Sequence, residues 1–288
     1  MSAGERTGAT AMTTADGKST LAGPEDLTDE SRAALAELLL ALADDEFVLG
    51  FWDSEWTGIG PALEEDVAYS SIAQDEIGHA RALYELLAQL TGRRADDLAY
   101  DRGPAGFRQA RLVGLERGDW AQSIARRYLY DTADAVRLAA LAGSSYAPLA
   151  GLLGKVRREE AYHLQHFDTW LRRLNGDPAG RARLATALAA LWPAALDLFT
   201  PLAHEDVLLG AGILPRPFAT LRAEWLAALA PILGELDLPF PAEQGADGRY
   251  HPTITPATGG RTGDHDPAFE RLWNEMTMVY RQEPGASW

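Results

Sequence analysis

Hydrophobic and polar positions along the chain repeat with helical spacing, and capping residues divide them into segments. Thr28, with two acidic residues behind it, predicts a helix that runs to about Ser54. The turn sequence Gly-Ile-Gly-Pro at residues 58–61 ends that helix. Pro61 is then expected as the first residue of a second helix, which stops at Gly92.

The same signals predict the rest of the chain to be helical. Further helices are expected at residues 119–141, 148–174, 177–199, 217–233 and 267–281, with a looser connection before the first of them. No segment alternates with period two between turn signals, so no sheet is expected. The predicted fold class is therefore all-α.

The two ends of the chain differ from its helical middle. Residues 1–28 are rich in small and polar residues and predict a disordered leader, followed by a single helical domain over residues 29–288. We expect a core bundle at about residues 29–175, and C-terminal helices and a tail at 177–288. The Gly- and Pro-rich residues 234–268 predict a long loop, which is either functional, packed on a partner, or a floppy linker.

Composition excludes several classes of protein. The chain has 26 basic and 42 acidic residues, a formal net charge of −16, which argues against nucleic acid or an anionic membrane as partner. The longest apolar run, residues 187–196, is far shorter than the roughly 20 residues of a membrane helix. There is no cysteine, which excludes disulfides and Cys-ligated clusters. A cytoplasmic protein is expected, and any redox chemistry needs an external source of electrons.

Two Glu-x-x-His motifs are the strongest chemical signal. Glu76 and His79 lie three residues apart in the second predicted helix, and Glu160 and His163 repeat this spacing in the fourth. Side chains at i and i+3 share one helical face and can bind the same metal. Both motifs interrupt apolar stripes, where an unpaired carboxylate costs several kcal/mol. Arg157, one turn before Glu160, offers a simpler partner for that carboxylate.

Two further carboxylates complete a pseudo-repeat. Thirty residues separate Glu46 from Glu76, and the midpoint is the turn at residue 61. Asp131 precedes Glu160 by 29 residues, with the midpoint in a turn at residues 145–146. Two antiparallel helices joined at such a midpoint bring both carboxylates to one level of the bundle.

One carboxylate from each of two helices, with Glu-x-x-His from each of the other two, is typical of ferritin-like di-iron bundles. The predicted metal ligands are Glu46, Glu76, His79, Asp131, Glu160 and His163. Their four negative charges balance two Fe(II), while the histidines stay neutral. The alternative is a set of buried polar groups without metal. Carboxylate and imidazole ligands do not by themselves separate iron from manganese.

Residues beside these ligands are weaker candidates. Asp45, Asp75, Asp134 and Glu159 adjoin ligands in sequence and are expected either to support them or to be solvated. His166 is interpreted as an ordinary polar residue. The remaining histidines lie outside the four-helix frame, so no catalytic residue and no cofactor-binding residue is assigned beyond the ligands.

Several stretches in order resemble the bacterial multicomponent phenylacetyl-CoA epoxidase (ring 1,2-epoxidase) family, within the ferritin-like monooxygenase superfamily. The similarity covers about residues 30–288 and is strongest to the C-type subunit. The stretches are residues 55–58 (EWTG), 73–81 (AQDEIGHAR), 124–128 (IARRY), 160–164 (EAYHL), 259–260 (GG) and 284–288 (PGASW).

The resemblance implies a role in phenylacetate catabolism. The A-type subunit of this family activates O₂ at a di-iron centre and epoxidises the ring of phenylacetyl-CoA, with electrons from a separate reductase. The C-type subunit pairs with it and is regarded as structural because its ligands are degraded. Here all six ligand positions are competent, and Asp131 is the residue type that the A-type subunit has there. A C-type subunit with a di-iron site, in a hetero-oligomer acting on a CoA thioester, is therefore implied.

Two other functions compete with this interpretation. The chain could be a non-catalytic scaffold for the A-type subunit, with a vestigial or structural metal site. It could also be a stand-alone ferritin-like iron oxidase or storage protein, which the extra C-terminal helices and the Gly/Pro-rich tail disfavour.

Overall fold

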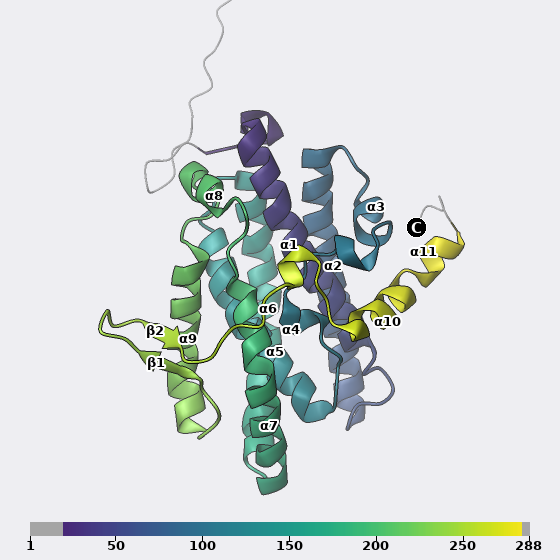
Figure 1. Ribbon diagram of the computed structural model, residues 1–288. Helices are drawn as coiled ribbons and strands as arrows, with labels where there is room; N and C mark the ends of the chain where they lie inside the picture. The colour runs from purple at the N-terminus through teal and green to yellow at the C-terminus, as the bar shows by residue number, and fades with distance from the viewer. Residues whose placement is uncertain (1–19, 284–288) are drawn as a thin grey trace, which may run out of the picture.

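Four long helices form the centre of the molecule. The computed structural model describes residues 20–283. The four are α1 (Asp29–Ser54), α2 (Leu63–Thr91), α5 (Trp120–Leu141) and α6 (Ala147–Asn175). Helix α1 packs along α2, and α5 packs along α6 (Figure 1). The all-α prediction and the ferritin-like bundle are confirmed.

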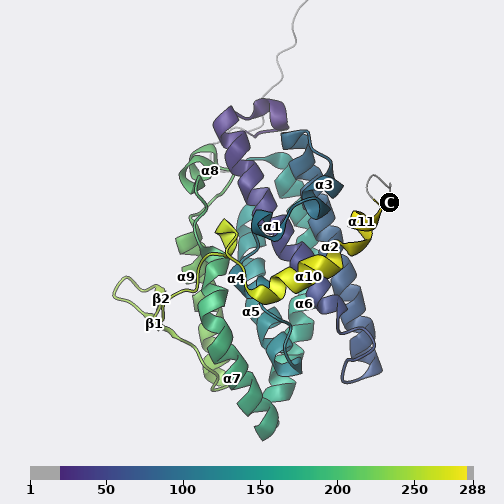
Figure 2. The same cartoon turned by 45° about the vertical axis from the view of Figure 1, so that its right-hand side comes forward.

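The remaining helices cover the outside of this bundle. Helices α7 (Pro178–Ala195) and α9 (Phe218–Glu235) pack against α5, while α10 (Pro267–Met276) crosses α1 (Figure 2). Shorter helices are α3 (Ala95–Tyr100), α4 (Arg111–Gly114), α8 (Glu205–Ala211) and α11 (Met278–Gln282). Single 3₁₀ turns occur at Pro24–Asp26, Pro104–Gly106, Leu196–Phe199 and Gly260–Thr262. Helices α3, α4 and α8 fall in segments where the sequence predicted connections.

Local capping explains why the helix starts were predictable. The side chains of Thr28, Asp119 and Asp177 each accept a hydrogen bond from the backbone N–H three residues later, at 3.1, 2.9 and 2.8 Å. These bonds satisfy donors that a helix leaves free at its N-terminus. The exception is α2, which begins at Leu63 rather than at Pro61. Its N-terminus is preceded by Ala62, which offers no capping side chain.

The prediction of no sheet is wrong for a short part of the tail. Strands β1 (Ala242–Gln244) and β2 (Tyr250–Pro252) pair antiparallel in a two-stranded hairpin. The tail also packs on its own bundle. Trp192 Nε1 donates to the Pro239 carbonyl at 2.9 Å, and Ala257 N donates to the Pro193 carbonyl at 2.8 Å. Residues 234–268 are therefore not a floppy linker, while a functional role or packing on a partner stays a prediction.

The first described residues also lie against the bundle. Leu21 exchanges backbone hydrogen bonds with Ser145 and Ala147, 2.8 and 2.9 Å long, beside the turn between α5 and α6. The sequence predicted a disordered leader up to residue 28, but residues 20–28 are ordered. The rest of the predicted leader, residues 1–19, and the terminal stretch 284–288 lie outside the described residues.

One segment in the described part of the chain is long and apolar enough to span a membrane. It comprises α7 and the following 3₁₀ turn, Pro178–Phe199, and 56% of its most apolar window is buried inside the bundle. Because this segment is mostly buried and packs on α5, it is a core helix of the bundle.

Candidate metal centre

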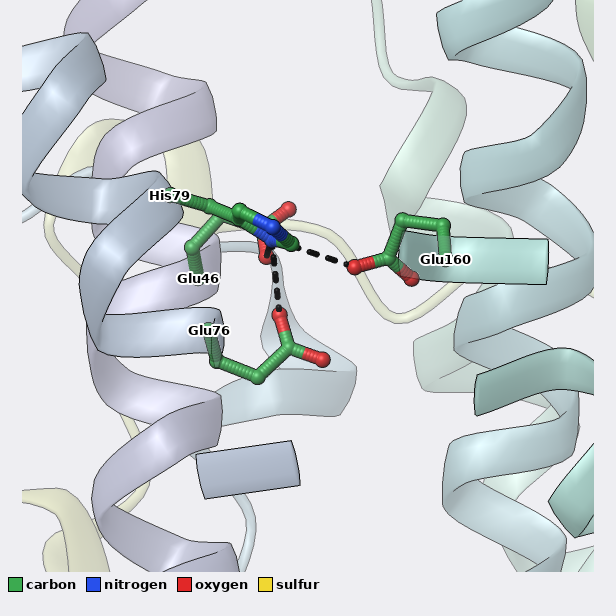
Figure 3. A group of neighbouring side chains, drawn as sticks. All are labelled: Glu46, Glu76, His79 and Glu160. Carbon is green, nitrogen blue, oxygen red and sulfur yellow. Dashed lines mark ion pairs between the residues drawn. The ribbon is translucent and has the colours of Figure 1, made fainter. Parts of the chain in front are cut away.

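Four ligand-type side chains converge in the middle of the bundle. Glu46 comes from α1, Glu76 and His79 from α2, and Glu160 from α6 (Figure 3). One ligand atom from each lies within 4.8 Å of every other, and all four residues are buried. His79 Nδ1 lies 3.2 Å from Glu160 Oε1, 3.9 Å from Glu46 Oε2 and 4.0 Å from Glu76 Oε2. This cluster could hold a metal ion.

The other two predicted ligands lie next to this cluster. His163 Nδ1 is 3.3 Å from Glu76 Oε1 and 3.2 Å from Glu160 Oε1. Asp131 is buried on α5, with Oδ1 3.0 Å from Arg127 Nη2. All six predicted ligands therefore lie in the bundle interior, but only four belong to the compact cluster. That the six act together as ligands stays a prediction.

Both histidines are oriented in the same crossed manner. Each turns Nδ1 toward the cluster and Nε2 toward a carboxylate on the facing helix. His79 Nε2 is 2.8 Å from Glu159 Oε2, and His163 Nε2 is 3.3 Å from Asp75 Oδ2. Each of these carboxylates directly precedes the glutamate of the other motif. Such outer contacts fix the ring orientation of metal-binding histidines.

Arg127 is the functional residue that sequence reasoning did not assign. Its side chain is fully buried, and Nη2 lies 2.6 Å from Glu76 Oε1 as well as close to Asp131. Nη1 lies 3.2 Å from Asp53 Oδ2. The signal in the sequence is an arginine one turn before Asp131 on the same helical face. Arg157, the cation considered for Glu160, is instead exposed.

The buried charges shift one another's pKa values. Burial, together with the nearby charge of Glu76, raises the pKa of Glu46 well above its usual range. Burial also raises the pKa of Asp131. For Glu76 burial opposes the charged form, but the charge of Arg127 together with contacts to Glu46 and His163 outweighs burial, so its pKa is lowered. Burial opposes the charged form of His79, but the carboxylates of Glu160 and Glu46 beside Nδ1 raise its pKa to about 12.

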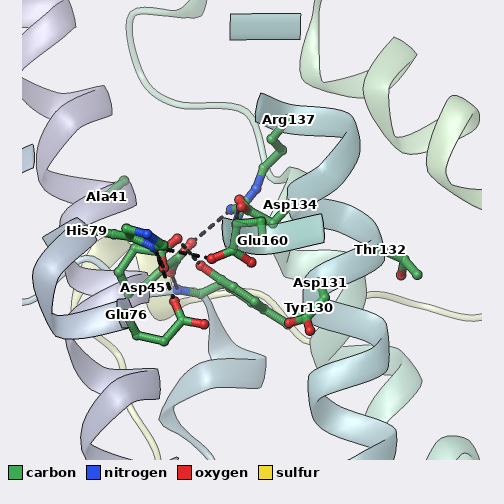
Figure 4. Close-up of polar contacts among 12 residues, drawn as sticks. Ala41, Asp45, Glu76, His79, Tyr130, Asp131, Thr132, Asp134, Arg137 and Glu160 are labelled. Atoms are coloured by element: carbon green, nitrogen blue, oxygen red, sulfur yellow. Dashed lines mark hydrogen bonds and ion pairs between the residues drawn. The ribbon is translucent and has the colours of Figure 1, made fainter. Parts of the chain in front are cut away.

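A second layer of charges lies beside the cluster (Figure 4). Arg137 donates from Nη1 to Asp45 at 2.9 Å and from Nη2 to Asp134 at 2.8 Å. The Tyr130 hydroxyl donates to Glu46 Oε1 at 2.9 Å, which leaves Oε2 facing His79. Asp45 and Asp134 are therefore buried and paired with Arg137 rather than solvated, and a supporting role for them stays a prediction.

Arg261 brings the C-terminal tail into this layer. It approaches both oxygens of Asp45, with Nη1 2.8 Å from Oδ1 and Nη2 2.7 Å from Oδ2. Its Nη1 also donates to the carbonyls of Ala41 and Arg108, at 2.9 and 2.8 Å. The loop after the hairpin is therefore anchored to α1 one residue before Glu46.

The chemistry of the cluster fits a cation. Buried atoms with no hydrogen-bond partner include Glu46 Oε2, Glu76 Oε2, both oxygens of Glu160, and Nδ1 of His79. Buried polar atoms are normally paired, and a divalent ion would pair all of these at once. Carboxylate and neutral imidazole are ligands that iron and manganese accept.

A small cavity borders His79, one of the four residues of the cluster. It has a volume of about 220 Å³ and lies between α2 and α6, where Gly78, His79, Val156 and Glu159 are among the lining residues. Its size admits small molecules rather than a CoA thioester. Of the remaining histidines, His166 lies 3.2 Å from Glu65 and does not belong to the cluster of four.

Comparison with known proteins identifies the family. Residues 12–288 match the model of the family described as phenylacetic acid catabolic protein. The C subunit of 1,2-phenylacetyl-CoA epoxidase from Escherichia coli is 32% identical over 256 residues, which cover 88% of this chain and 99% of that protein. The A subunit of the same enzyme is 27% identical over 180 residues, 62% of this chain and 58% of that protein. The chain belongs to the phenylacetic acid catabolic protein family.

Proposed function

We propose that this member of the phenylacetic acid catabolic protein family is a C-type subunit of a 1,2-phenylacetyl-CoA epoxidase complex, and that its bundle binds iron. The likeness to the Escherichia coli C subunit extends over nearly the whole of that protein, whereas the likeness to the A subunit covers little more than half. The partner is then an A-type subunit, and the substrate is a CoA thioester bound by the complex.

The observation that carries the metal-binding part is the cluster of Glu46, Glu76, His79 and Glu160. These side chains come from three helices, are buried, and leave several oxygen atoms and one imidazole nitrogen without hydrogen-bond donors. Iron bound there would supply the electron transfer that O₂ activation requires. The chain has no cysteine to hold an iron–sulfur cluster, which agrees with electrons delivered by a separate reductase.

The protein's own groups prepare the cluster for an ion. Glu159 holds the His79 ring so that Nδ1 points inward, and Tyr130 fixes one oxygen of Glu46 so that the other faces His79. The cavity between α2 and α6 reaches the edge of His79, where Glu159 also lines it. Carboxylates raise the basicity of imidazole ligands through such contacts.

A non-catalytic scaffold is the alternative that one observation favours. Arg127 forms ion pairs with Glu76 and Asp131, both predicted ligands, so part of the buried negative charge is neutralised without any metal. A bundle neutralised in this way can support an A-type subunit while contributing no chemistry.

Co-expression with an A-type subunit tests the proposal. The complex is isolated by size exclusion, loaded anaerobically with Fe(II), and assayed for iron content and for epoxidation of phenylacetyl-CoA with a reductase present. Glu160→Gln removes a ligand, whereas Glu243→Gln changes an exposed carboxylate of the hairpin and serves as control. We expect Glu160→Gln to lose iron and turnover together, and the control to keep both.

Other outcomes select the other functions. If Glu160→Gln loses iron but the complex keeps full turnover, the chain is a scaffold. If the two proteins do not associate, the assignment to an epoxidase complex is wrong. If the isolated chain oxidises and mineralises iron without partner or CoA thioester, it is an iron oxidase or storage protein.

A further inference from the structure

The six predicted ligands divide into two halves that share Glu76 and Glu160. In the first half, Glu46 Oε2, Glu76 Oε2 and Glu160 Oε1 surround His79 Nδ1 at 3.9, 4.0 and 3.2 Å. In the second half, Glu76 turns its other oxygen, Oε1, toward His163 at 3.3 Å, and Asp131 approaches from α5. A dinuclear centre would need one cation in each half.

The second half already contains a cation. Arg127 Nη2 lies 2.6 Å from Glu76 Oε1 and 3.0 Å from Asp131 Oδ1, so one nitrogen contacts both carboxylates that would bind a second ion. The first half differs, because no Lys or Arg among residues 20–283 forms an ion pair with Glu46 or Glu160. Their only charged partners there are the two histidines.

Arg127 is held in this position from several sides. Its side chain is fully buried, and its second nitrogen, Nη1, lies 3.2 Å from Asp53 on α1. The guanidinium carbon lies 4.9 Å from the centre of the Phe167 ring and 5.8 Å from that of Tyr130. Moving the guanidinium aside would leave the carboxylates of Asp53 and Asp131 buried without their cation, which is strongly unfavourable.

We propose that the bundle binds a single metal ion, at Glu46, Glu76, His79 and Glu160, and that Arg127 takes the place of a second ion between Glu76 and Asp131. This inference rests on the proposed metal site and differs from the two-ion site that the ligand spacing predicted. A divalent ion at Glu76 Oε1 would compete with the guanidinium for the same oxygen and would be repelled by its charge. His163 then acts as a hydrogen-bond partner of Glu160 and not as a metal ligand.

Metal counting on the full-length protein tests this inference. The protein is loaded with Mn²⁺ under argon, and bound metal is measured by mass spectrometry together with the electron paramagnetic resonance spectrum. We expect one Mn²⁺ per chain with the six-line signal of an isolated ion. Electron spin-echo modulation should show one coordinated imidazole nitrogen, that of His79. Two ions per chain with a spin-coupled multiline signal would overturn the inference while leaving the proposed metal-binding function in place.

Variants test the part played by the arginine. Arg127→Met, combined with Asp53→Asn to keep the buried charge balanced, should double the bound Mn²⁺ and give the coupled signal. Arg137→Met is the matched control, because Arg137 is also buried on α5 between two carboxylates but touches none of the cluster of four. It should still bind one ion.

Three outcomes count against the inference. One ion in a folded Arg127→Met/Asp53→Asn protein, verified by circular dichroism, would show that Arg127 does not exclude the second ion. Two imidazole nitrogens on the single ion of the unaltered protein would contradict the role given to His163, even if the variants do not fold. Absence of bound metal from the unaltered chain would overturn both this inference and the proposed metal-binding function.

Discussion

Metal binding should become tighter as the pH rises, and His79 is the reason. In the metal-free protein, the carboxylates of Glu160 and Glu46 beside Nδ1 raise the pKa of His79 to about 12. The imidazole therefore carries a proton throughout the range from pH 6 to 8. A metal ion needs the Nδ1 lone pair, so binding has to release that proton. Raising the pH favours release of the proton and therefore favours binding of the ion.

The size of the effect follows from linkage. Each proton displaced per ion makes the apparent affinity rise about tenfold per pH unit. At pH 7, roughly five units below the pKa of His79, removing its proton costs on the order of 7 kcal/mol, at about 1.4 kcal/mol per unit. Burial also raises the pKa of Glu46 well above its usual range, and any proton on that carboxylate adds to the slope. The expected slope therefore lies between tenfold and a hundredfold per pH unit.

Chelator competition at pH 6, 7 and 8 measures the slope with Mn²⁺ as the probe. Titration calorimetry in two buffers of different ionisation enthalpy counts the protons directly. His166→Gln is the control, because burial lowers the pKa of His166 and its ring lies outside the cluster of four. It should leave the slope unchanged. An affinity that does not change from pH 6 to 8, with no proton release, would refute the argument that His79 is both charged and a ligand.

Two further predictions concern stability and are checked by denaturant unfolding. Arg261→Met should destabilise the protein by about 3 kcal/mol because it removes a buried partner of Asp45. The control Arg111→Met, in a partly exposed ion pair, should cost less than about 1 kcal/mol, and equal losses would contradict this ranking. Gly92→Ala should destabilise the protein by about 1–2 kcal/mol because φ is +70° at this helix end, a conformation that alanine adopts at a cost. Gly151→Ala, in open space on α6, should stabilise the protein by about 0.5–1 kcal/mol because alanine favours a helix. A loss of stability at both positions would refute this reasoning from backbone conformation.

Features set by local chemistry were predictable from the sequence. Capping by Thr28, Asp119 and Asp177 depends on hydrogen bonds within four residues, and these helix starts are confirmed. The position of the carboxylates along the bundle was also predictable. When a turn joins two antiparallel helices, residues at equal distances from that turn lie side by side. Glu46 and Glu76 accordingly belong to one cluster.

Features that depend on distant contacts were not predictable. Arg261 reaches Asp45 across 216 positions of sequence, and only the folded tail brings the two together. Arg127 precedes Asp131 by one turn, but its contact with Glu76 depends on how α5 packs near α2. The hairpin was missed because each of its strands has three residues, too few for an alternating pattern.

The arginines of the bundle explain how so many carboxylates can be buried before any metal binds. Asp44 pairs with Arg102, Asp45 with Arg137 and Arg261, and the carboxylates near Glu76 with Arg127. Each buried acid needs a counter-charge, and side chains of the same chain supply it at all of these positions. Of the buried acids within residues 20–283, only Glu46 and Glu160 have histidines alone as charged partners. Glu46 and Glu160 are therefore the ion-paired buried carboxylates at which a metal ion would meet no competing arginine.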